Sequence, residues 1–158
     1  MTQLTFGYSD SQDRVWLSST DGARFWLTRR LIKGSIKPVC DLLEQTVPGG
    51  EIPNALPAPE RVALEHAEAM ADSPEGQPAL EKNKETRTAG GTPASPPALV
   101  TSLTFKVGAT RCTLIITAGG APVSIDLNRM DFHRLLGALG KIIGSAGWDI
   151  PGLPDWLA

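Results

Sequence analysis

The sequence predicts an α+β fold made of two tandem copies of one unit, each with three strands followed by one helix. Leu4-Thr5-Phe6 recurs as Leu103-Thr104-Phe105, and Leu27-Thr28-Arg29 recurs as Leu127-Asn128-Arg129. Both copies then continue with the apolar spacing of an amphipathic helix. Five apolar positions coincide in the two helices: Ile32, Ile36, Val39, Leu42 and Leu43 align with Phe132, Leu136, Leu139, Ile142 and Ile143. Agreement at so many core positions indicates an internal duplication.

The first unit spans residues 1–47. Strands are expected near residues 4–6, 14–18 and 25–27, and a turn containing Gly22 joins the last two as a hairpin. Thr28 precedes the helix and can cap its first turn. Pro38 lies inside the helical pattern and removes the hydrogen bond to the carbonyl of Gly34, which predicts a kink or a break there.

The second unit spans residues 99–147 and repeats this order. Its expected strands lie near residues 103–105, 111–115 and 123–125, with a turn at Gly119-Gly120 and Asn128 as the helix cap. The second helix carries glycines at spacings of three and four, which allow another chain segment to approach closely. We therefore expect it to be the more buried helix. The glycines are Gly137, Gly140 and Gly144.

A single unit of this kind buries one face of a small sheet and is close to the lower size limit of a stable domain. Two units related by a pseudo-twofold axis would cover each other's apolar faces, either as one six-stranded antiparallel sheet or as two stacked sheets. The prediction is one composite α+β domain with two main helices.

The segment between the units, residues 48–98, is rich in Pro, Ala, Glu, Gly and Thr and contains no aromatic residue. This composition is typical of a largely disordered linker. Residues 59–70 begin with proline and continue with good helix formers, which favours a weak helix in a tether. An alternative is a short partner-binding helix that uses Val62, Leu64 and Met70.

The chain ends in a segment rich in tryptophan and proline, residues 148–158. Two interpretations are open: the tail folds back over the sheet, or it is a docking peptide whose large side chains fill pockets on another protein. The partner-binding residues in the second case are Trp148, Ile150, Leu153, Trp156 and Leu157.

Composition and charge exclude several classes of function. The chain has 158 residues, a net charge of −2 and a pI of about 5.7, so no global positive field attracts nucleic acid or an acidic membrane. No stretch has the length and hydropathy of a membrane span, and the start has no secretory pattern. Cys40 and Cys112 have no metal-ligand spacing and are expected to be reduced core thiols. We expect a cytoplasmic protein with neither metal nor cofactor.

No catalytic constellation is recognisable. His66 lies in the linker, and His133 lies on the flank of the second helix, where we expect a solvated or capping role. His133 and Asp131 do not face each other, because residues two apart on a helix point in different directions. The sequence contains no phosphate-binding loop, HExxH or GxSxG motif. We therefore do not expect an enzyme.

A basic cluster supports a binding role. Arg29, Lys33 and Lys37 form one stripe on the first helix, with Arg24 and Arg30 nearby, and Trp16 and Trp26 lie on the adjoining strands. Basic residues beside aromatic rings are typical of single-stranded nucleic-acid binders. A solvated helix face would look the same.

Strands followed by a helix, twice per chain, resemble the duplicated repeats of the PUR and whirly group of single-stranded nucleic-acid binders. The segment that carries this resemblance is Ser124-Ile125-Asp126-Leu127-Asn128 with the amphipathic helix after it. The resemblance implies a nucleic-acid partner. This chain departs from the group in having three strands per unit instead of four, an acidic pI and a long central insertion.

The favoured prediction is a non-enzymatic protein-interaction or scaffold protein that associates with a protein partner or with itself. Single-stranded nucleic-acid binding through the basic cluster is the alternative.

Overall fold

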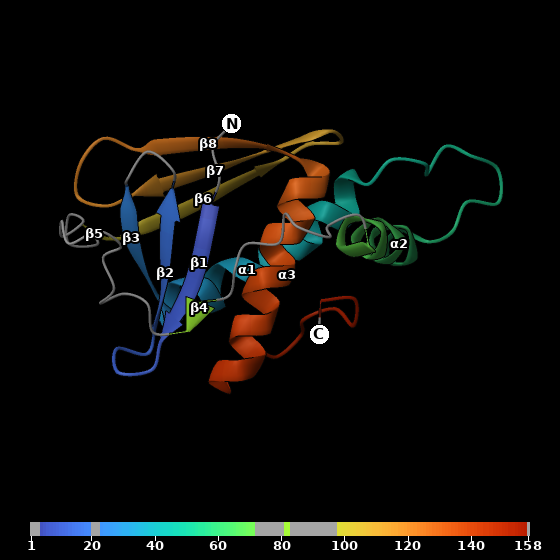
Figure 1. Cartoon of the computed structure of the whole chain (residues 1–158). Coiled ribbons are helices and arrows are strands. Elements are labelled where there is room, and N and C mark those ends of the chain that lie inside the picture. The colour runs from blue at the N-terminus through green and yellow to red at the C-terminus, as the bar shows by residue number, and fades with distance from the viewer. Residues whose placement is uncertain (1–3, 20–22, 72–80, 83–97, 158) are drawn as a thin grey trace.

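In a computed structural model, residues 4–19, 23–71, 81–82 and 98–157 are described. These residues form the α+β class that the sequence predicts, with two sheets and three helices (Figure 1). Two details add to the predicted antiparallel sheets and two main helices. Two short strands pair in parallel with the first sheet, and a third helix, from the predicted linker, packs on the core.

The first unit forms an antiparallel meander of β1 (Leu4–Ser9), β2 (Arg14–Ser19) and β3 (Arg24–Thr28). The short strands β4 (Glu81–Lys82) and β5 (Ala98–Leu99) extend it at its two edges, so that the order is β4-β1-β2-β3-β5. Helix α1 (Arg29–Thr46) follows β3 directly.

The second unit has the same order of elements. Strands β6 (Ser102–Val107), β7 (Arg111–Thr117) and β8 (Val123–Asn128) form a separate three-stranded antiparallel sheet, and α3 (Arg129–Ala146) follows β8 directly. Residues 98–107 link the sheets, because β5 pairs with β3 and β6 pairs with β7. The six-stranded alternative is therefore wrong, and each half keeps its own sheet.

Both helix caps are confirmed. The hydroxyl of Thr28 accepts from the backbone N–H of Leu31 at 3.2 Å, and the side chain of Asn128 accepts from that of Asp131 at 2.7 Å. Helix α1 continues through Pro38, so the predicted break is absent. Since Gly34 and Pro38 are both exposed, the carbonyl that loses its helical partner lies on the solvent side.

The two halves pack reciprocally around one apolar core. Helix α1 lies against β6 of the second unit, and α3 lies against β1 of the first unit. Each helix thereby covers apolar surface of the other unit, which that unit cannot cover by itself. A pseudo-twofold axis would produce this arrangement, but the symmetry itself and the domain boundaries stay predictions.

The expected glycine contacts are present in part of α3. A Cβ at Gly137 would lie 2.7 Å from the sulfur of Met70, and one at Gly140 would lie 2.9 Å from the carbonyl oxygen of Leu157. A Cβ at Gly144 would meet nothing within 4 Å. Helix α3 is also more extensively buried than α1, as predicted.

Residues 59–70, interpreted from sequence as a weak helix in a tether, lie in a helix that is packed on the protein. Helix α2 (Ala58–Ala71) lies against α3 and α1, and Val62, His66 and Ala69 are buried (Figure 1). Their spacing of four and three places all three on one face of the helix, and it is this face that packs on the core. The rest of the linker, residues 72–80 and 83–97, lies outside the described residues.

The tail folds back on the core. Trp148 and Leu157 are buried, and Ile150, Leu153 and Trp156 are partly buried against core residues. The tail is thus packed on the protein, but its contacts lie on the helices, at His66, His133 and Gly140, and on the turn after β1, and not over a face of a sheet as the first interpretation expected. None of the described helices combines the length and hydropathy needed to cross a bilayer.

Candidate functional site

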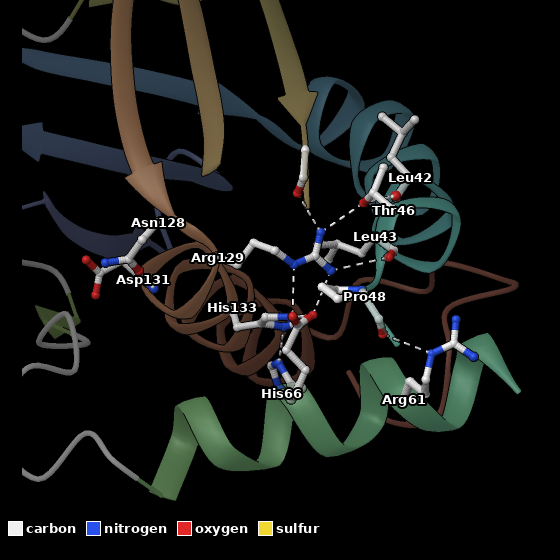
Figure 2. Close-up of polar contacts among 12 residues, drawn as sticks. Leu42, Leu43, Thr46, Pro48, Arg61, His66, Asn128, Arg129, Asp131 and His133 are labelled. Carbon is white, nitrogen blue, oxygen red and sulfur yellow. Dashed lines mark hydrogen bonds and ion pairs between the residues drawn. The ribbon is translucent and has the colours of Figure 1, made fainter. Parts of the chain in front are cut away.

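The most concentrated polar chemistry of the described chain is a buried cluster between the three helices, shown in Figure 2. At its centre, Arg129 at the start of α3 binds Glu65 of α2 through two parallel hydrogen bonds of 2.6 and 2.9 Å. The remaining N–H groups of this guanidinium donate to Thr46, Gly108 and the carbonyl of Leu43. All five donors are thus satisfied, as a side chain that is only 5% exposed requires.

Two histidines continue this cluster. His133 lies one turn after Arg129, and its Nε2 is 2.6 Å from the same Glu65 carboxylate. Its Nδ1 is 3.1 Å from Nδ1 of His66, so one of the two rings must donate and the other accept. Trp156 of the tail packs against both rings. The expectation that His133 is solvated is wrong, because His133 is completely buried.

The ionisation of this cluster follows from its burial. Burial opposes charge on Glu65, but hydrogen bonds from His133 and Arg129 outweigh it and lower the pKa of Glu65 to about 2. Burial, with the charge of His133 as a smaller cause, lowers the pKa of His66 to about 4. The cluster therefore holds an ionised carboxylate and arginine beside a neutral His66 at neutral pH. Its contacts join three helices and the tail, which is a structural role.

A second cluster anchors the tail to the turn between β1 and β2. The indole N–H of Trp148 donates to Asp13 at 2.7 Å, and the hydroxyl of Tyr8 donates to the same oxygen. Arg29 lies 3.6 Å from the other carboxylate oxygen and above the Trp148 ring. Burial and then the Asp13 contact raise the pKa of Tyr8 to about 12, whereas the Tyr8 and Trp148 hydrogen bonds lower the pKa of Asp13.

The structure separates the residues predicted to bind nucleic acid. Trp16 and Trp26 are opposite each other on β2 and β3, and Arg24 shares their face of the sheet. Phe25 and Leu27 on the other face belong to the core that α1 covers, so the α1 cations lie on the far side. Trp16 is only 4% exposed. Arg29 is paired with Asp13, and Lys37 is paired with Asp41 at 3.3 Å.

Both cysteines are free and buried, as expected. Burial raises the pKa of both thiols, that of Cys40 to about 12, so neither is a reactive thiolate at neutral pH. Within the described ranges, no three His, Cys, Asp or Glu side chains gather closely enough to hold a metal ion.

Sequence reasoning missed an ordered apolar surface where α1 leads into α2. The side chain of Arg61 donates to the carbonyl of Pro48 (Figure 2) and to that of Leu56, and so ties together the two ends of the connecting loop. This loop exposes Ile52 and Leu56, and α2 exposes Leu64, at 61%, 50% and 60%. They are three of the five large apolar side chains exposed in the described chain.

The exposed face of α2 is also acidic. Glu60, Leu64 and Glu68 recur every four residues and are all exposed. No cation among the described residues pairs with either glutamate. We call these three residues, together with Ile52 and Leu56, the α2 surface. The spacing of Glu60, Leu64 and Glu68 in the sequence already places them on one side of a helix. Only the packing of the opposite face of α2 shows that this side faces solvent.

Comparisons with protein-family models, curated proteins and solved structures find no match to this chain.

Proposed function

We propose that this chain is a non-enzymatic interaction protein of the cytoplasm that binds a protein partner through the α2 surface. The observation that carries the proposal is the exposure of three large apolar side chains beside a loop that Arg61 holds at both ends: Ile52 and Leu56 lie in this loop, and Leu64 lies on α2. Large apolar side chains that a folded surface leaves exposed are candidates for contact with a partner. The tail residues first predicted to bind a partner are largely used within the fold.

The burial of the polar clusters supports a binding role over a catalytic one. Glu65, Arg129, His133 and His66 satisfy one another and hold the helices together. A catalytic acid or base must instead reach a substrate. The clusters therefore account for a rigid scaffold on which the α2 surface is presented.

The proposal is tested by affinity capture from the native lysate with the tagged full chain. The variant Ile52→Ser with Leu64→Ser should lose a stoichiometric partner that the wild type retains. Leu99→Ser with Val123→Ser is the matched control, because these apolar residues are exposed elsewhere. Equal capture by wild type and the Ile52/Leu64 variant would remove the α2 surface as the binding site.

Single-stranded nucleic-acid binding stays the alternative proposal. It has less support, since Trp16 is buried and the cations and tryptophans lie on different sides of the first sheet. Addition of an oligonucleotide at low salt should leave the tryptophan fluorescence unchanged. Quenching that weakens steeply with salt would favour the alternative.

A further inference from the structure

An open groove of about 440 Å³ runs beside the first turns of α1, between this helix and the segment that links β5 to β6. Leu31 gives it an apolar wall, Arg30 lies at its rim, and Thr28, Ser35 and Thr101 add polar groups to its lining, whereas Val100 is only 4% exposed. A Cβ built on Gly34 would meet nothing within 4 Å, so the helix backbone is bare on this side of the groove. A bulky side chain from another molecule could therefore approach α1 closely here.

The surroundings of the groove are positively charged. Arg30 is exposed, Lys33 lies one turn further along α1, and the first turn of this helix contains no acidic residue. The partial positive charge of the helix N-terminus has the same sign. The groove can therefore take an aliphatic side chain beside Leu31 and the bare backbone at Gly34, and Arg30 with the helix N-terminus favours negative charges on either side of that chain.

The α2 surface presents this chemistry. Leu64 projects between Glu60 and Glu68, each one turn away, and all three are exposed. The two glutamates are separated along the helix by about 12 Å, a length comparable with the first two turns of α1. Within one molecule the groove and this stripe belong to different places in the fold, so a contact between them requires two molecules.

We propose that the α1 groove receives the Glu60-Leu64-Glu68 stripe of a second copy of this chain, so that the protein associates head to tail. This inference rests on the proposed function, because it names a second copy as one partner of the α2 surface. When two copies meet through two different surfaces, one groove and one stripe of the dimer stay free. Further copies can therefore add to the dimer, unless the rotation between neighbouring copies closes a ring. Because the contact is small, we expect a dissociation constant on the order of 10–100 µM that weakens as salt is added.

The test is sedimentation of the purified full chain over a range of concentrations up to about 500 µM, above the expected dissociation constant. One variant, Gly34→Phe, fills the groove and keeps the stripe. The other, Glu60→Lys with Glu68→Lys, reverses the stripe and keeps the groove. Each variant alone should sediment as a monomer, and an equimolar mixture should form a 1:1 dimer that does not grow. Gly144→Phe is the matched control, because a Cβ there also meets nothing within 4 Å, and it should associate like the wild type.

Formation of the mixed dimer also shows that both variants are folded. A wild type that stays monomeric throughout would overturn the inference, as would self-association that persists in either variant alone. These results leave the proposed function untouched, since that depends on capture of a different protein and on its loss in the Ile52/Leu64 variant. If the Ile52/Leu64 variant still captures the partner and the groove and stripe variants still self-associate, both the proposed function and this inference are overturned.

Discussion

Arg29 and Arg129 occupy the same place in the two halves of the chain and have different environments. Each follows a capping residue and begins a helix of 18 residues. The side chain of Arg129 is 5% exposed and binds Glu65 bidentately, whereas that of Arg29 is 44% exposed and lies 3.6 Å from Asp13. The same pattern of a capping residue followed by arginine has therefore produced one buried and one surface ion pair.

The difference arises from what covers each arginine. Helix α2 packs beside the start of α3 and supplies Glu65, while the end of α1 supplies two further acceptors. Arg29 instead faces the edge of the tail, where solvent screens its contact with Asp13. The stability that an ion pair contributes depends on its burial. The same substitution should therefore have very different effects on stability at the two sites.

The largest effect is expected from Arg129→Met. This change leaves the Glu65 carboxylate with His133 as its remaining partner and the carbonyls of Leu43 and Gly108 without this donor in a buried site, which should lower the free energy of unfolding by about 3–5 kcal/mol. Urea denaturation measures this loss. The double variant Arg129→Met with Glu65→Leu should lose less free energy of unfolding than the sum of the losses of the two single variants. The reason is that neither partner is then left as an unpaired buried charge. A single-variant loss below about 1 kcal/mol, the range of surface pairs, would contradict the structural role of this pair.

The second prediction concerns acid stability. His66 has an ordinary pKa of 6.5 and a folded pKa of about 4, so the unfolded chain takes up a proton at a higher pH than the folded chain does. Stability from this group is complete above pH 6.5 and falls as the pH decreases toward 4. Between pH 7 and pH 5 the loss should be about 2 kcal/mol. Glu65 should add a further loss between its ordinary pKa of 4.5 and its folded value of about 2.

Denaturation midpoints at pH 7 and pH 5 test this prediction. His66→Gln has no proton to take up, so its midpoint should change much less over the same interval. An equal change in wild type and variant would show that His66 does not control the acid response.

A smaller effect is expected at the exposed cluster. Asp13 has a φ of 50°, and Asp13→Gly keeps this left-handed backbone while removing the carboxylate. Because the side chain is 47% exposed, we expect a loss of no more than about 1 kcal/mol. The sharper readout is Tyr8, the one tyrosine of the chain, whose pKa of about 12 should move toward 10 in an ultraviolet absorbance titration. A Tyr8 pKa that does not change would show that Asp13 is not its partner in solution.

The smallest effect is expected from Arg29→Met, which makes the same substitution as Arg129→Met in the other half. Exposure and the 3.6 Å separation predict a change within about 0.5 kcal/mol, and added salt should reduce it further. Parallel denaturation of the two methionine variants gives the comparison directly. Similar losses at both positions would mean that burial does not separate these arginines.

Local patterns predicted much of the fold. Alternating and helical spacings located the strand runs of both meanders and the two long helices, and Thr28 and Asn128 identified where those helices begin. These features depend on neighbours within a few residues, so the sequence displays them directly. The helix does not break at Pro38, because the carbonyl that loses its partner faces solvent, where water can replace it, and the kink there stays a prediction.

The candidate surface was not predictable in the same way. The sequence predicted a weak helix at residues 59–70 but not its packing on the core, because the buried face of α2 is short and includes His66, which is not recognisable as a core residue. Leu64 was named among the residues of a partner-binding helix, but its companions Val62 and Met70 pack inward. Only the docking of α2 on α3 separates the side chains that stabilise the fold from those that are presented to a partner.

The sequence by itself determined the order of the elements, their caps and the apolar positions that must be buried. Tertiary structure decided which arginine is buried, that α2 and the tail complete the core, and which face of α2 is exposed. The reason is the range of the interactions involved. A cap or an amphipathic stripe is satisfied within one or two turns, but Arg129 finds Glu65 across 64 residues of chain, and no local pattern specifies that pairing.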